Sequence, residues 1–180
     1  PPGGLEAALS LGKNLENLII FNSLSKRSNA CGMRAGFIVG DENIIENYKL
    51  LVSNGASPVP IPIQKVASSL YDDDHHQIES CLHYDKNFEI AENYLKPFYK
   101  DFKIPDAGFF LWLKVNDDKK AAKDLWGKFS LRVMPGSFMA KDVNGINPGR
   151  GYLRISLVDK EDVIEETMRR ICLFLKMDNV

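Results

Sequence analysis

The spacing of apolar residues changes along this chain, and the change limits the folds it can adopt. Residues 18–21 form a short continuous apolar run, typical of a strand buried on both faces, and residues 36–40 predict a second strand. Apolar residues from Ile78 to Phe98 then recur every three or four positions, which predicts a long helix that Pro97 stops or kinks. Apolar residues from Phe109 to Val115 recur at every second position, which predicts a strand with one buried face. Together these patterns predict an α/β protein.

Further signals complete the expected elements. Asp41 is a good helix N-cap, and apolar residues repeat at three and four positions after it. The prolines of residues 57–62 should interrupt any helix, and helical character resumes at residues 64–71. The remaining predicted elements are a helix at 117–128, strands at 131–134 and 152–158, and a last helix capped by Asp159.

Composition excludes several classes of protein. The 180 residues carry 23 basic and 24 acidic side chains, and no run of Lys or Arg exceeds two, so we expect no nucleic-acid partner and no anionic membrane. No apolar stretch approaches the ~20 residues of a membrane helix, and we expect a cytoplasmic protein. Three widely spaced cysteines indicate reduced, buried thiols rather than disulfides.

The polar loop at residues 22–31 and its continuation to Phe37 carry the most informative chemistry. The loop follows a predicted buried strand, and open parallel sheets bind ligands at the carboxyl ends of their strands. Its hydroxyls, its glycines and Arg34 suit a phosphate. Lys26 can form a Schiff base with a carbonyl ligand if Arg34 and Arg27 depress its pKa. A phosphorylated aldehyde would satisfy both requirements, although a Ser-rich loop with solvated cations has the same composition.

The segment from Ser23 to Phe37 resembles the cofactor-lysine signature of the class I/II aminotransferases, which are fold-type I pyridoxal-phosphate enzymes. In that family a serine three residues before the lysine and an arginine eight residues after it hold the cofactor phosphate, within a Gly-x-Arg-x-Gly frame. Gly32 and Gly36 supply that frame here. The resemblance implies a catalytic lysine and a cofactor-binding set made of Ser23, Ser25, Lys26 and Arg34.

A second segment, residues 151–157, resembles the same family. The resemblance implies that Arg154 binds the substrate α-carboxylate with two parallel hydrogen bonds, a task that suits a guanidinium. Without the resemblance, Arg154 would be read as a strand-capping or surface-paired arginine. Residues 105–112 and 134–138 also look like small-domain segments of the family, so the likeness covers nearly the whole chain in order.

The family resemblance implies a domain organisation and a reaction. Residues 1–74 would end the large cofactor-binding domain, residues 75–103 would form a long connecting helix, and residues 104–180 would form an α+β small domain. Pyridoxal 5′-phosphate would be the cofactor, and amino acids and 2-oxo acids the substrates, in a homodimer. Lys26 would hold the cofactor covalently and act as the acid and base that moves a proton during transamination.

The narrower expectation concerns the substrate. Residues 134–140 and 147–154 look most like bacterial succinyldiaminopimelate aminotransferases, which implies lysine biosynthesis with glutamate as the second amino acid. An aspartate or alanine specificity would use the same catalytic residues. The chain opens on Pro1 and lacks a match to the family's Gly-rich phosphate loop, so we expect an inactive C-terminal fragment of a longer enzyme. The alternative to an enzyme is a protein of another functional class, a non-catalytic module.

A metal site is not expected. Three histidines and Cys81 fall in the predicted long helix, but Cys81 and His83 share no helical face, and His76 and His83 are seven positions apart. We expect no metal ligand among them.

Overall fold

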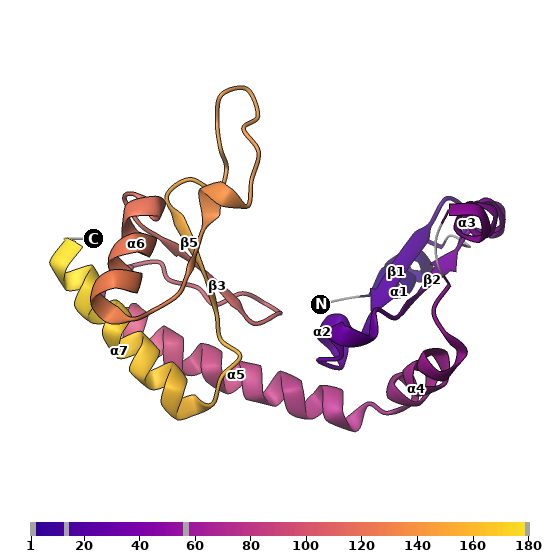
Figure 1. The fold of residues 1–180 in the computed structure, drawn as a ribbon, viewed down its shortest axis with the longest axis horizontal. Coiled ribbons are helices and arrows are strands. Elements are labelled where there is room, and N and C mark those ends of the chain that lie inside the picture. Colours follow the sequence, from indigo (N-terminus) through magenta and orange to yellow (C-terminus); the bar gives the residue numbers. More distant parts are fainter. Residues whose placement is uncertain (1–2, 13–14, 56–57, 179–180) are drawn as a thin grey trace. The chain divides into compact units, whose positions relative to one another are not determined.

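The computed structural model describes residues 3–12, 15–55 and 58–178 (Figure 1). The elements in chain order are α1 (Gly4–Ser10), β1 (Ile19–Ser23), α2 (Leu24–Arg27), the 3-10 helix η1 (Cys31–Met33), β2 (Gly36–Gly40), α3 (Glu42–Gly55), α4 (Ile61–Asp72), α5 (His75–Leu95), β3 (Phe110–Lys114), α6 (Asp118–Phe129), β4 (Met134–Pro135), the 3-10 helix η2 (Gly136–Phe138), β5 (Tyr152–Ser156) and α7 (Glu161–Asp178). The chain divides within α5 into two compact units, Pro1–Ser80 and Cys81–Val180.

The first unit is built on an antiparallel pair of strands. β1 and β2 pair from Ile19 opposite Gly40 to Ser23 opposite Gly36. A Cβ atom on Gly36 would lie 2.2 Å from the carbonyl oxygen of Asn22, so only glycine allows this close approach. The helix α2 follows β1 directly, and its buried Leu24 packs with Ala35 and with α4.

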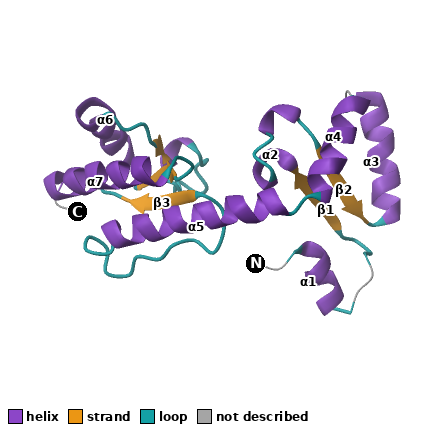
Figure 2. Cartoon of the chain, turned by 90° about the horizontal axis from the view of Figure 1, so that it is seen from below, coloured by secondary structure: helices purple, strands orange, loops and turns teal. Residues whose placement is uncertain are grey.

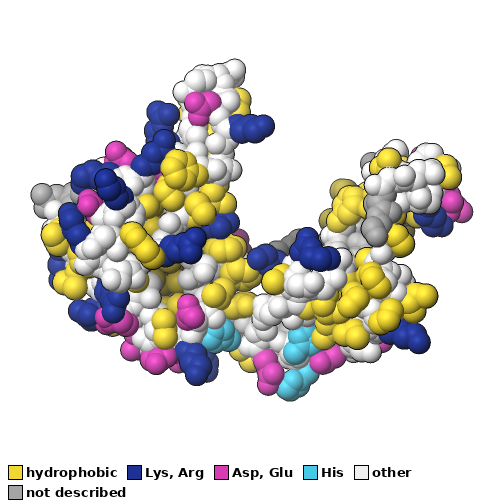
Figure 3. Space-filling model, viewed as in Figure 1, with side chains coloured by type: hydrophobic (Ala, Val, Ile, Leu, Met, Phe, Trp, Pro, Cys, Tyr) yellow, Lys and Arg dark blue, Asp and Glu magenta, His cyan; other side chains and the backbone are white. Residues whose placement is uncertain are grey.

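The predicted strands at 18–21 and 36–40 are present, but two expectations are wrong: that residues 18–21 are buried on both faces, and that the strand belongs to a parallel sheet. The pair is antiparallel, and Phe21 is 68% exposed. Phe37 is also exposed, and Figure 3 shows hydrophobic side chains at the surface of this unit. Among the described residues, β1 and β2 pair only with each other. The ring centroid of Tyr48 lies 6.2 Å from that of Phe21, and the ring centroid of Tyr71 lies 5.0 Å from that of Phe37, so each phenylalanine is covered only in part.

The helices of the first unit largely follow the sequence pattern. Asp41 caps α3, since its Oδ1 accepts hydrogen bonds from the N–H groups of Asn43 and Ile44 at 2.9 and 3.2 Å. Helix α4 begins at Ile61, three residues earlier than predicted, because a proline in the first helical turn removes no needed donor. The Ser57 position of the predicted interruption lies outside the described residues.

The second unit places helices against a three-stranded antiparallel sheet of order β3-β5-β4 (Figure 2). The alternation predicted for residues 109–115 is confirmed: Leu111, Leu113 and Val115 are buried, whereas Trp112 and Lys114 are exposed. The buried strand residues share one core with buried residues of α5, α6 and α7. One face of the sheet is therefore covered by helices, and the other carries the polar and aromatic side chains.

Several predicted boundaries in the second unit move. Helix α5 ends at Leu95, two residues before Pro97, so the predicted connecting segment 75–103 is helical over 21 residues only. The strand expected at 131–134 is β4, Met134–Pro135, because only these residues pair with β5. The last helix begins at Glu161, so Lys160 is at the N-cap position and Asp159 lies one residue before it.

The cysteines also differ from expectation. Cys31 and Cys81 are exposed and Cys172 is half-buried, and all three are free thiols. Cys81 is exposed on α5 although it belongs to the apolar helical pattern, so that pattern did not ensure burial. No helix among the described residues is long and apolar enough to span a membrane.

Candidate functional site

The structure places three of the predicted site residues on one turn of the chain. Ser23 is the N-cap of α2: its Oγ accepts a hydrogen bond from the N–H of Ser25 at 3.2 Å and donates to the Ser25 hydroxyl at 3.0 Å. Leu24 is fully buried, and its N–H donates to the carbonyl oxygen of Ala35 at 3.2 Å. Lys26 is exposed on this short helix. The buried leucine thus fixes the turn, while the two hydroxyls and the amine remain accessible.

Arg34 lies on the loop that folds back on α2. The N–H of Ala30 donates to the carbonyl oxygen of Leu24 at 3.2 Å, which ties this loop to the helix. Arg34 ends η1 in the left-handed region, with φ of 52°, and its Nη1 donates to the carbonyl oxygen of Cys31 at 2.9 Å. A left-handed backbone is uncommon for arginine and accompanies the tight turn from η1 into β2.

Arg27 does not take the role expected from the sequence, that of a cation acting on Lys26. Its guanidinium is half-buried and turned to the end of α4, where Nη1 donates to the carbonyl oxygen of Leu70 at 2.6 Å. The Arg27 side chain therefore serves the fold of this unit.

Arg154 lies in the middle of β5, on the sheet face that helices leave uncovered. It is opposite Trp112 on one side and Met134 on the other. Its guanidinium carbon lies 4.5 Å from the centroid of the Phe110 ring, a cation–π contact. No carboxylate among the described residues pairs with it, so its N–H donors remain available to a bound carboxylate.

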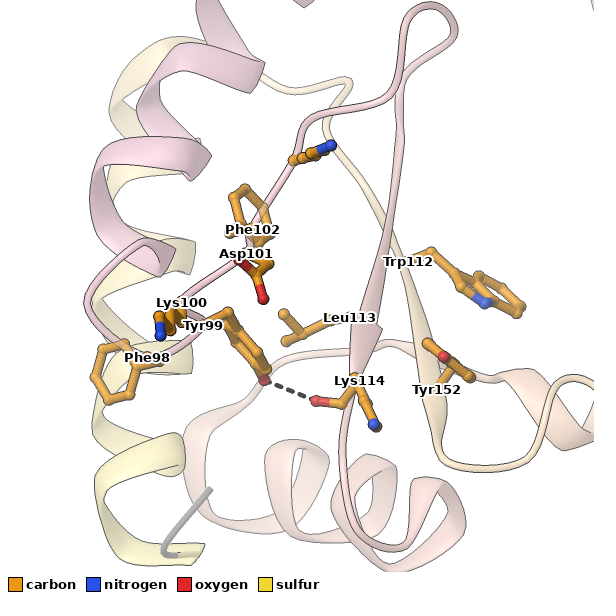
Figure 4. A pocket seen from close by; sticks show the side chains of 10 residues that line it. Phe98, Tyr99, Lys100, Asp101, Phe102, Trp112, Leu113, Lys114 and Tyr152 are labelled. Atoms are coloured by element: carbon orange, nitrogen blue, oxygen red, sulfur yellow. Dashed lines mark hydrogen bonds between the residues drawn. The ribbon is translucent and has the colours of Figure 1, made fainter.

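An aromatic pair continues this sheet face toward a cleft of about 580 Å³ (Figure 4). Trp112 and Tyr152 stack with ring centroids 5.8 Å apart and planes 15° apart. The facing segment, residues 98–103, is held by the Tyr99 hydroxyl, which donates to the carbonyl oxygen of Lys114 at 2.7 Å. Burial raises the pKa of Tyr99, so this hydroxyl stays protonated as a donor.

A buried carboxylate that sequence reasoning missed holds the start of β5. Asp118, 3% exposed, accepts hydrogen bonds from the N–H of Ser137 at 2.9 Å and the N–H of Gly151 at 3.2 Å. Burial favours the neutral acid, but these hydrogen bonds outweigh it and lower the pKa of Asp118. Asp118 thus ties the first turn of α6 to the residue that precedes β5. The Asp117–Asp118 doublet is the only sequence signal, and it reads simply as a helix cap.

The family described as aminotransferase class I and II matches residues 3–171. The chain belongs to this family. Members depend on pyridoxal phosphate, so the expected α/β fold and the expected cofactor class of the family are both confirmed.

Individual relatives agree with this assignment. An LL-diaminopimelate aminotransferase of Natranaerobius thermophilus is 31% identical over 171 residues, which are 93% of this chain and 43% of the relative. An aminotransferase structure from Neisseria meningitidis Z2491 is 38% identical with a TM-score of 0.88. The match covers 97% of this chain and 45% of the Neisseria chain. The structure of aminotransferase AspB from Helicobacter pylori 26695 is 29% identical with a TM-score of 0.86. The match covers 98% of this chain and 45% of the AspB chain. The chain spans less than half the length of these relatives.

The residues on the α2 turn fit the cofactor of the family. Pyridoxal phosphate needs an amine for its aldehyde and hydroxyl or guanidinium donors for its phosphate. The first unit offers these groups on Lys26, Ser23, Ser25 and Arg34. Among the described residues, no group of three His, Cys, Asp or Glu side chains has the arrangement of a metal site.

Proposed function

We propose that the protein carrying this chain is a pyridoxal-phosphate-dependent aminotransferase that moves an amino group between an amino acid and a 2-oxo acid. The observation that supports this most directly is the α2 turn, which carries Ser23, Ser25 and Lys26 and to which the loop of Arg34 is hydrogen-bonded. This turn lies inside the region that matches the aminotransferase family.

Each residue has a chemical task in this proposal. The bound cofactor supplies an electron sink for the bond broken at the substrate α-carbon. Ser23, Ser25 and Arg34 would hold the cofactor phosphate through hydrogen bonds. The amine of Lys26 would hold the cofactor through its aldehyde carbon and would serve as the base for the proton on the substrate α-carbon. The planar guanidinium of Arg154 would donate two parallel N–H hydrogen bonds to the oxygens of the substrate carboxylate, while the Phe110 ring lies against its face.

We propose succinyldiaminopimelate and glutamate as the amino-acid pair, in lysine biosynthesis. Support comes from curated relatives named LL-diaminopimelate aminotransferase in Natranaerobius thermophilus and Dehalococcoides mccartyi, the latter 26% identical. An aspartate or alanine specificity is the second candidate, because the catalytic residues would be shared.

The organisation of the whole protein is part of the proposal. Residues 1–74 are the end of a large cofactor-binding domain, and residues 104–180 form the small domain. Residues 75–103 connect these two domains, in a homodimeric cytoplasmic enzyme. Because the chain spans less than half of its relatives, we propose that it does not catalyse the reaction alone. A non-catalytic module would instead show no turnover in any form.

The test is covalent trapping of the cofactor. The full-length gene product is mixed with pyridoxal phosphate and reduced with borohydride, and the labelled peptide is found by mass spectrometry. We expect the label on Lys26, and we expect Lys26→Ala to lose both the label and turnover. Lys65 is an exposed lysine of the same unit, and Lys65→Ala should keep both. Label on another lysine, or turnover by Lys26→Ala, would refute the assignment. A full-length product with neither label nor turnover would support the module.

A further inference from the structure

The two residues that follow Lys26 are tied to the junction between α4 and α5. Arg27 supplies the first tie. Its Nη1 donates to the carbonyl oxygen of Leu70 at 2.6 Å, and its Nη2 donates to Asp74 Oδ1 at 2.5 Å. Its guanidinium also lies 5.4 Å from the centroid of the Tyr71 ring. The last carbonyls of a helix lack partners within the helix, so a half-buried guanidinium at this end satisfies them and neutralises the helix dipole.

His76 supplies the second tie. Its Nε2 lies 2.9 Å from the hydroxyl oxygen of Ser28, and its Nδ1 lies 2.9 Å from Asp73 Oδ2. Asp73 is fixed in turn, because its Oδ1 accepts a hydrogen bond from the N–H of His75 at 2.8 Å at the start of α5. The hydrogen bond from His76 is the main cause of a lowered pKa for Asp73, and the bond from the His75 backbone adds to it. The carboxylate therefore stays ionised and orients the imidazole toward Ser28.

These contacts matter because α2 is short. It has four residues, and one turn of helix is not stable in water without tertiary contacts. Leu24 anchors its first residue in the core. The last residue of α2, Arg27, and the next, Ser28, are anchored by backbone carbonyl and side-chain groups of a segment 43 to 48 positions further along the chain. Lys26 lies between the two anchors.

We propose that a clasp made of Arg27, Ser28, Asp73, Asp74 and His76 positions Lys26 for its reaction. The inference rests on the proposed function of Lys26, but the clasp itself is a property of the fold. These are positioning residues: none of them needs to touch the cofactor. With the clasp intact, the backbone of the α2 turn stays in one conformation while the lysine amine bonds to and leaves the cofactor.

The first experiment measures the turn itself. Amide hydrogen exchange of residues 24–30 is followed by mass spectrometry in the cofactor-free, full-length gene product. Loss of one tie, in Ser28→Ala or His76→Leu, should speed exchange there about fivefold or more, the factor expected for one hydrogen bond. Ser28→Thr keeps the hydroxyl and should restore slow exchange. His75→Leu is the matched control, because His75 is on the same turn of α5, its side chain is 80% exposed and faces Glu79 at 3.6 Å, and the substitution keeps its backbone bond to Asp73.

The second experiment measures the consequence for Lys26. Ser28→Ala and His76→Leu should lower kcat several-fold and leave the KM for the amino acid nearly unchanged, since Arg154 is untouched. The double variant should be no slower than the slower single variant, because either change opens the same tie. Asp74→Asn removes the carboxylate that pairs with Arg27 and so tests the Arg27 tie in the same way, with Asp72→Asn as its control. This pair of variants keeps the test available if His76→Leu does not fold.

The outcomes are separable. Unchanged exchange of residues 24–30 in Ser28→Ala and Asp74→Asn, or an equal effect of His75→Leu, would overturn the clasp. Faster exchange with unchanged kcat would show that the clasp orders the turn without positioning the amine, which also overturns the proposal. If borohydride places no label on Lys26 of the wild-type protein, the proposed function fails, whereas the exchange result stands on its own.

Discussion

Replacing Asp118 by Ala tests whether one buried carboxylate holds the strand that carries Arg154. The substitution leaves the N–H groups of Ser137 and Gly151 without their acceptor. A hydrogen bond to a charged group contributes about 1.5–3 kcal/mol, and both donors are half-buried and regain some water, so we expect a loss of about 2–4 kcal/mol. Because Gly151 precedes β5 directly, the KM for the amino acid should rise several-fold as the strand loosens.

The neighbouring carboxylate is the control. Asp117 caps α6 by accepting hydrogen bonds from the N–H groups of Lys119 and Lys120 at 3.0 and 2.9 Å, and it has no bond to the β5 region. Asp117→Ala should cost about 1 kcal/mol, the usual effect of losing an N-cap, and leave the KM unchanged. Urea denaturation and steady-state kinetics of the full-length gene product measure both quantities. Equal destabilisation by the two substitutions, with no rise in KM for Asp118→Ala, would refute the reasoning.

Three further predictions concern the same unit. Arg154→Lys should raise the KM for both the amino acid and the 2-oxo acid more than it lowers kcat, because an ammonium cannot make two parallel hydrogen bonds to a carboxylate; steady-state kinetics with an unaltered KM would contradict this. Gly149→Ala should lower the melting temperature, because the added Cβ would lie 2.1 Å from the carbonyl oxygen of Gly136 and such overpacking costs about 1–3 kcal/mol; an unchanged melting curve would count against the close crossing. Because the pKa of Asp118 is lowered in the folded protein, the stabilisation by its carboxylate is complete above the unfolded pKa, near 3.8, and is lost as the pH falls through the lower folded value. The difference in unfolding free energy between wild type and Asp118→Asn should therefore shrink in that pH window. A difference that does not depend on pH in acid denaturation would exclude this.

Local patterns predicted the elements well, because each depends on neighbours in sequence. The alternation around Leu111 and Leu113 and the cap at Asp41 needed only residues within a few positions, and both predictions are confirmed. Burial of a strand depends on what packs over it. Phe21 is apolar, yet it is 68% exposed, because the ring of Tyr48, in an edge contact, covers only part of it.

The candidate site divides in the same way. Fixed spacings within one segment pointed to Lys26 and Arg34, and a second motif pointed to Arg154; their family is confirmed, and their individual roles remain predictions. The supporting contacts had no such signal. Asp118 meets Gly151 across 33 positions, and His76 meets Ser28 across 48, so only the folded chain brings them together.

The stacked ring pair on the open sheet face gives the second unit an optical reporter. The chain has two tryptophans, and the second, Trp126, is 62% exposed on α6. Replacing Trp126 by Phe would leave Trp112 as the one source of tryptophan fluorescence among the residues of this chain. Since Trp112 lies on Tyr152 and directly opposite Arg154, its fluorescence would respond when a carboxylate docks on that guanidinium. Ligand binding in the second unit could then be titrated without following turnover at all.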